Sequence, residues 1–195
     1  MSLVLSFDIC EGSNCNTLKF TETTGAYSTS NTSGWGAPNM STGNAVSATL
    51  TITTPSGDVL TPINMHILPP SFPSEDFTQE YSIPLTSLGE NSSITDGVWS
   101  FLYTVVCTQD LITVTYTQRV TQGFYCQVDC CVKSMFKNID VECDCSKDQL
   151  SKAAKAYLLL KGLKYSANAG DISKFNSDLA LLQKMCLNSD CNNCK

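Results

Sequence analysis

The composition of this chain changes abruptly after Gln127, and the change limits the folds available to each part. All seven prolines, both tryptophans and every threonine of the 195 residues lie before it, and seven of the eleven cysteines lie after it. Threonine, valine and tyrosine between proline and glycine are typical of strands and turns, whereas alanine, leucine and lysine without proline are typical of helices. The sequence therefore predicts an α+β protein, with a β domain over residues 1–127 and a small Cys-rich helical domain over residues 128–195.

Segments of alternating apolar and polar residues predict antiparallel strands in the first part. Strong alternation covers 3–9, 46–54, 97–106 and 111–120, and weaker alternation covers 16–21, 58–61 and 79–84. About seven short strands at this spacing are typical of a β-sandwich related to the immunoglobulin fold. Trp99 is the expected core aromatic of a central strand.

In the second part the apolar residues follow the period of a helix. They predict a short helix that begins after Asp129 as its N-cap, followed by an antiparallel hairpin of helices over 147–165 and 172–187. The two apolar stripes of this hairpin are Leu150, Ala153, Ala154, Tyr157, Leu160 and Leu163, and Ile172, Phe175, Leu179, Leu182 and Cys186. A core from about 68 residues is thin, so we expect this domain to need a staple or a partner.

An antiparallel hairpin would bring five cysteines to one end of the helical domain: Cys143, Cys145, Cys186, Cys191 and Cys194. Cys126, Cys130 and Cys131 would lie about 15 Å away, near the start of the first helix. The cluster has four interpretations: disulfides or close thiol pairs, a structural zinc site made by Cys143, Cys145, Cys191 and Cys194, buried or free thiols, or a redox motif in "CNNC". A redox motif would need a helix after it, and only Lys195 follows.

The sequence offers no recognisable catalytic site, and we expect no enzyme activity and no certain cofactor. The single histidine, His66, has no acid or nucleophile at a familiar spacing, and no phosphate-binding glycine loop, HExxH or EF-hand pattern occurs. The net charge of −6 disfavours direct nucleic-acid recognition. No run of about 18 apolar residues predicts a membrane span, and the first residues lack the basic start of a secretory signal.

A turn-rich loop over residues 24–44 carries two aromatic side chains, Tyr27 and Trp35. Loops of this length are often binding elements or are ordered by a neighbouring molecule. The alternative is a loop whose tryptophan packs back on its own domain. Tyr27 and Trp35 are therefore the candidate interface residues of the first part.

Several blocks of sequence follow one another in a characteristic order: "TLKFTETTGAYSTSNTSGWGAPN", "ATLTITTPSG", "ITDGVWSFLYTV", "YCQVDCCVKSMFK" and "LALLQKMCLNSDCNNC". In these blocks the chain resembles virion structural proteins of crAss-like tailed bacteriophages. The resemblance implies a non-enzymatic protein present in many copies, in the neck or tail barrel where ring proteins stack below the portal. It supplies no functional residue that can be carried over to this chain.

Two functions are compatible with these features. The first is a subunit of a closed homo-oligomeric ring that contacts other neck or tail proteins, in a virion assembled in the cytoplasm of a bacterial host. The second is a recognition or decoration module that binds a host or carbohydrate surface through the 24–44 loop. Loss of assembly on Trp35→Ala would favour the ring, whereas loss of ligand binding with normal assembly would favour recognition.

Overall fold

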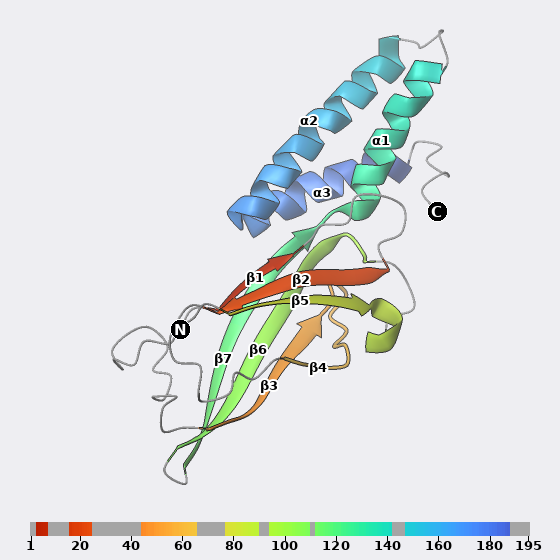
Figure 1. The fold of residues 1–195 in the computed structure, drawn as a ribbon. Helices are drawn as coiled ribbons and strands as arrows, with labels where there is room; N and C mark the ends of the chain where they lie inside the picture. Colours follow the sequence, from red (N-terminus) through yellow and green to blue (C-terminus); the bar gives the residue numbers. More distant parts are fainter. Residues whose placement is uncertain are drawn as a thin grey trace. The chain divides into compact units, whose positions relative to one another are not determined.

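The computed structural model describes residues 3–7, 16–24, 44–65, 77–89, 94–109, 112–141 and 147–187. Within these ranges the fold contains two antiparallel sheets and three α-helices, and it therefore belongs to the α+β class that the composition predicts (Figure 1). The chain forms two compact units. One comprises Met1–Asp8, Leu18–Asn91 and Ser100–Val120, and the other comprises Ile9–Thr17, Ser92–Trp99 and Thr121–Lys195.

The three-stranded sheet has the strand order β1-β2-β5, from β1 (Leu3–Phe7), β2 (Thr17–Thr24) and β5 (Phe77–Pro84). β1 pairs antiparallel with β2, and Phe7 lies opposite Phe20. The ring of Phe20 stacks on Tyr81 of β5 at 4.8 Å between centroids. A short 3₁₀ helix, η1 (Leu85–Leu88), follows β5 and buries its first and last leucines.

The four-stranded sheet has the strand order β4-β3-β6-β7. Its strands are β3 (Asn44–Thr53), β4 (Ile63–Asn64), β6 (Gly97–Gln109) and β7 (Ile112–Phe124). Ala48, Leu50 and Ile52 on β3 are buried while the residues between them are partly exposed, which confirms the alternation read from the sequence. β6 buries Trp99, Phe101 and Tyr103 in the same way, so Trp99 is a core aromatic as expected.

The weak strand expected at 58–61 is wrong. This segment belongs to a tight turn after β3, in which Val59 makes only an isolated bridge to Thr53, and the next strand begins at Ile63. The turn forms because Pro55 stops the strand and Gly57 adopts a left-handed conformation with φ of 95°. Strand propensity alone did not reveal this local geometry.

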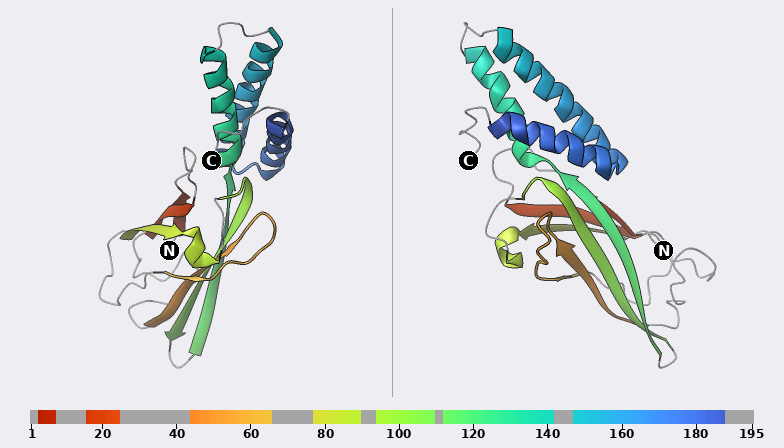
Figure 2. Two further views of the ribbon diagram at one scale, coloured as in Figure 1. Left: turned by 90° about the vertical axis from the view of Figure 1, so that its right-hand side faces the viewer. Right: turned by 180° about the vertical axis from the view of Figure 1, so that it is seen from behind.

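The three helices are α1 (Cys126–Val141), α2 (Lys147–Ala169) and α3 (Ile172–Leu187), as seen from two sides in Figure 2. The hairpin of α2 and α3 matches the sequence prediction, including its break. Gly170 has φ of 68°, and the Asp171 side chain caps α3 by accepting a hydrogen bond from the backbone N–H of Lys174 at 3.0 Å. The helical core consists of Tyr125, Val128, Val132, Ala156, Leu160, Leu163, Phe175, Leu179 and Leu182.

The ends of β6 and β7 contribute to the unit that holds the helices. Trp99 meets Phe124 edge to face, with 5.9 Å between ring centroids, and its indole N–H donates to the carbonyl oxygen of Thr95. Gly123 at the end of β7 lies so close to Phe175 of α3 that an added Cβ would stand 2.6 Å from a ring carbon. The helices therefore pack on strand residues that precede them in the chain.

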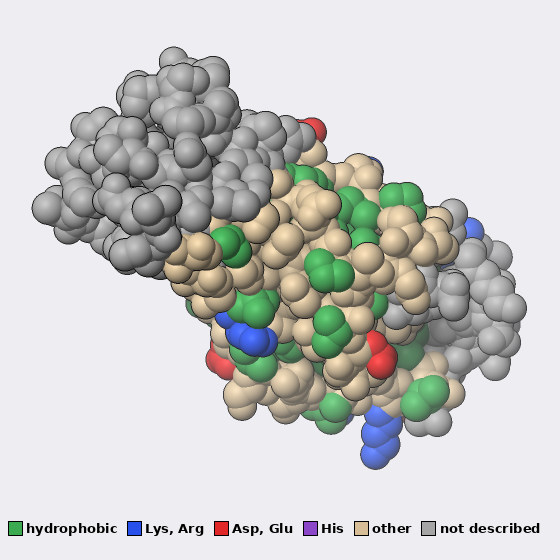
Figure 3. All heavy atoms as spheres, turned by 90° about the horizontal axis from the view of Figure 1, so that it is seen from below, with side chains coloured by type: hydrophobic (Ala, Val, Ile, Leu, Met, Phe, Trp, Pro, Cys, Tyr) green, Lys and Arg blue, Asp and Glu red, His purple; other side chains and the backbone are tan. Residues whose placement is uncertain are grey.

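Uncharged side chains and backbone make up most of the described surface seen in Figure 3. Hydrophobic, basic and acidic side chains are scattered singly over the coloured part of this view, without a broad basic area of the kind that neutralises phosphates. In the described ranges no helix is both long and apolar enough to cross a membrane.

Candidate interaction surface

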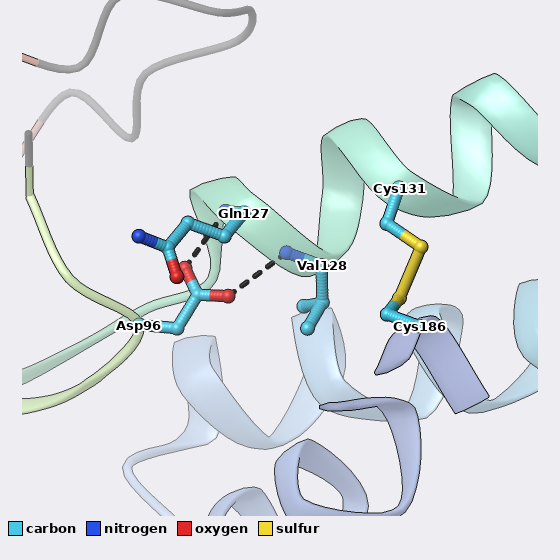
Figure 4. The surroundings of a disulfide bond; sticks show 5 residues. All are labelled: Asp96, Gln127, Val128, Cys131 and Cys186. Carbon is cyan, nitrogen blue, oxygen red and sulfur yellow. Dashed lines mark hydrogen bonds between the residues drawn. A yellow bond between two sulfur atoms is a disulfide. The ribbon is translucent and has the colours of Figure 1, made fainter. Parts of the chain in front are cut away.

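The start of α1 is held by a carboxylate from a distant part of the chain. Asp96, just before β6, accepts hydrogen bonds from the backbone N–H groups of Gln127 and Val128, each at 2.8 Å (Figure 4). These are two of the N–H groups that a helix leaves without partners in its first turn. Asp96 therefore acts as a non-local cap that ties the β6 start to α1.

Burial raises the pKa of Asp96 from its usual value of 3.8 to about 6, although the hydrogen bonds from Gln127 and Val128 oppose this shift. The negative charge of nearby Asp129 adds to the increase. Asp96 therefore titrates at about pH 6, well above an ordinary aspartate.

The prediction that Asp129 is the N-cap of α1 is wrong. The helix begins earlier, at Cys126, because Tyr125, Val128 and Val132 extend its apolar face into the core. Asp129 lies buried in the first turn, 2.7 Å from the Lys133 Nζ and 2.9 Å from the Lys164 Nζ of α2. Burial alone would raise the pKa of Asp129, but the hydrogen bonds and positive charges of these two lysines lower it. The network joins α1 to α2.

A disulfide joins Cys131 of α1 to Cys186 near the end of α3, with 6.1 Å between Cα atoms (Figure 4). The bond corrects the expectation that Cys131 would lie about 15 Å from the cysteine cluster that contains Cys186. Cys143 and Cys145 lie outside the described residues. α2 has 23 residues and α3 has 16, so at 1.5 Å per residue α3 is about 10 Å shorter. The end of α3 therefore reaches only the first half of α1. Cys130 also takes part in a disulfide.

One helix, α2, has apolar residues on its solvent side as well as on its core side. Its buried residues are Ala153, Ala156, Leu160, Leu163 and Ser166. The expected core positions Leu150, Ala154 and Tyr157 are instead exposed, which corrects the predicted stripe. Because α2 carries apolar residues on two sides, their spacing in the sequence could not identify the buried face.

We call the second apolar face the α2 stripe. It consists of Leu150, Tyr157, Leu158 and Tyr165, which are 56%, 43%, 68% and 73% exposed. Leu150 and Tyr157 are seven residues apart, as are Leu158 and Tyr165, which is about two helical turns. All four side chains lie within an arc of about 100° on one side of α2. An exposed row of four large apolar side chains is typical of a surface that binds another molecule.

Neighbouring groups add an aromatic edge and positive charge to the α2 stripe. Phe136 of α1 meets Tyr157 edge to face at 5.7 Å between centroids, and the Lys161 ammonium lies 4.9 Å from the centre of the Tyr157 ring. Lys147 and Lys161 are exposed and lie three residues before Leu150 and after Leu158, on the same side of the helix. The surface is therefore apolar along its centre and basic beside it.

We call the unit of Met1–Asp8, Leu18–Asn91 and Ser100–Val120 the β unit; it has a different kind of exposed surface at the turn after β3. Val59 is 66% exposed, and it follows the exposed carboxylate of Asp58. The turn is held by hydrogen bonds from the N–H of Thr54 to the carbonyl of Asp58, from the N–H of Asp58 to the Thr54 hydroxyl, and from the Ser56 hydroxyl to the Asp58 carboxylate. These bonds fix an apolar side chain beside an acidic one.

The residues that the sequence singled out as site candidates lie outside the described residues. These are the four proposed zinc ligands Cys143, Cys145, Cys191 and Cys194, the loop aromatics Tyr27 and Trp35, and His66. Elsewhere, in the ranges that the structure does describe, no three His, Cys, Asp or Glu side chains gather as a metal site. The zinc and loop-binding hypotheses stay predictions.

Sequence reasoning missed the Asp96 cap and the α2 stripe for different reasons. Asp96 and Gln127 are 31 residues apart, and no local pattern links them. The stripe had a signal in the spacing of Leu150, Tyr157 and Tyr165, but the same helix also carries the core positions. No protein-family model, curated protein or solved structure matches this chain.

Proposed function

We propose that this chain is a non-enzymatic structural subunit of a virion, present in many copies as a closed ring in the neck or tail barrel of a tailed bacteriophage. The α2 stripe is the observation that carries the proposal. A small helical unit that keeps four large apolar side chains exposed has a surface for a partner, and repeated contacts between identical subunits close into rings. The resemblance to structural proteins of crAss-like phages supports the same function.

In this proposal the two sheets serve as a rigid scaffold for such contacts. We propose that the two sheets form a β-sandwich related to the immunoglobulin fold, in which each sheet turns one face toward a common core. Buried residues alternate along β3 and β6, and Leu18 and Phe20 are buried on β2. A rigid sandwich would hold the turn after β3 in a constant position from one subunit to the next.

In this proposal the protein resides in the virion after assembly in the host cytoplasm, contacts other copies of itself and other neck or tail proteins, and does not read nucleic-acid sequence. The helical unit is stapled by the Cys131–Cys186 disulfide and by the Asp129 ion pairs. These bonds would keep the partner-binding face of α2 in a fixed shape.

Electron microscopy of the purified protein and mass spectrometry of purified particles test the proposal together. We expect closed rings of uniform diameter and many copies of the chain in each particle. A protein that stays monomeric at high concentration and is missing from particles would rule out this function.

A further inference from the structure

We propose that the α2 stripe of one copy binds the turn over residues 54–60 of a second copy, so that identical subunits join head to tail. The inference rests on the proposed function, because it names the partner and the two surfaces that would build the ring. It is carried by the exposed apolar side chains on both surfaces and by their opposite charges.

The apolar parts of the two surfaces are complementary. The stripe offers leucine and tyrosine side chains along about four turns of α2, from Leu150 to Tyr165. Val59 is the large hydrophobic residue that stands exposed in the described part of the β unit. A single β-branched side chain on a rigid turn can insert between side chains of a helix face without ordering a flexible segment first. Little conformational entropy would therefore be lost on binding.

The charges of the two surfaces favour this pairing over contact between two α2 helices. Lys147 and Lys161 lie beside the stripe, so two stripes face to face would bring like charges together. Asp58 stands beside Val59 and offers the opposite charge. Across the whole chain, residues 1–127 hold ten acids and two bases, whereas residues 128–195 hold eight acids and ten lysines.

The turn is already in a conformation that can bind. The Thr54 and Ser56 hydroxyls lie 2.8 Å apart, and the Ser56 hydroxyl donates to the Asp58 carboxylate at 2.6 Å. The backbone N–H of Leu60 donates to the carbonyl of Ile52, which ties the far end of the turn to β3. A helix binding a turn is a heterologous contact, and repetition of such a contact produces a closed ring or a filament.

A charge exchange between Lys161→Glu and Asp58→Lys tests the contact, with the oligomeric state measured by analytical ultracentrifugation. We expect each variant alone to weaken self-association about 10-fold or more. An equal mixture of the two variants should recover oligomers in which the two chains alternate, because every contact between unlike chains joins opposite charges, either in the native or in the exchanged arrangement. The double variant should regain the full oligomer.

Apolar variants and matched controls distinguish loss of the contact from unfolding of the protein. Leu158→Ser and Val59→Ser should weaken self-association, whereas Leu181→Ser, at a half-exposed position of α3, and Lys19→Glu on β2 should not. Circular dichroism establishes that every variant is folded. Wild-type oligomers that all of these substitutions leave intact would overturn the inference but not the ring function. A wild-type protein that is monomeric at every concentration would overturn both.

Discussion

At the scale of single residues, Asp96 should make the stability of the protein depend on pH near 6. Its carboxyl group has a pKa of about 6 in the folded chain and 3.8 as a free aspartate, so the folded state binds the proton more tightly. This group therefore adds stability as the pH falls from 6 toward 4, and that stability, up to about 3 kcal/mol, is lost as the pH rises through 6. Asp96→Asn should remove this dependence.

Urea unfolding of the wild type and of Asp96→Asn between pH 4.5 and 7.5 measures the effect. Asp148→Asn, at an exposed position in the first turn of α2, is the matched control and should keep the wild-type slope. Asparagine can still accept a hydrogen bond at the start of α1, so Asp96→Ala should be about 1 kcal/mol less stable than Asp96→Asn at every pH. An unchanged slope in Asp96→Asn would show that another group titrates.

A second prediction at this scale concerns Gly123. A Cβ there would stand 2.6 Å from the Phe175 ring, so Gly123→Ala should destabilise the protein by about 1–3 kcal/mol through overpacking. The double variant Gly123→Ala with Phe175→Leu should recover part of this loss, because leucine leaves room for the methyl group. Thermal unfolding of Gly123→Ala, Phe175→Leu and the double variant measures the recovery. A double variant that loses the full sum of the two single losses would exclude a steric origin.

At the scale of elements, the Cys131–Cys186 disulfide closes a segment of 55 residues between α1 and α3. Cys131→Ser should reduce the free energy of unfolding by about 2–4 kcal/mol, mainly because the unfolded chain gains entropy. Cys186→Ser and the double variant should lose the same amount, since each removes the same bond. Unfolding with and without dithiothreitol measures these losses. Additive losses would mean that the two cysteines act separately.

In the whole molecule, some residues that stabilise the helices lie before the break in composition. The N-terminal cap of α1 comes from Asp96, and Trp99, Val98 and Phe124 belong to the unit that holds the helices. An isolated fragment of residues 128–195 should therefore show little cooperative unfolding by circular dichroism, even with its disulfides oxidised. A sharp thermal transition in that fragment would show that the helical core is self-sufficient.

The class of the protein, most of its strands and the helical hairpin can be predicted from the sequence. These depend on local physics: alternation along β3 and β6, helical spacing along α3, and the break at Gly170 and Asp171 act over a few residues. The immunoglobulin-like sandwich, the zinc ligands and the loop aromatics stay predictions. The virion function stays a proposal.

Long-range packing determines which face of α2 is buried, what caps α1 and which cysteine bonds to Cys186. Each depends on packing between segments that are distant in sequence. α2 carries apolar residues on both sides, so the position of α1 and α3 selects Ala153 and Leu160 for the core and leaves Leu158 and Tyr165 exposed. The different lengths of α2 and α3 place Cys186 beside Cys131, a consequence that local spacing does not contain.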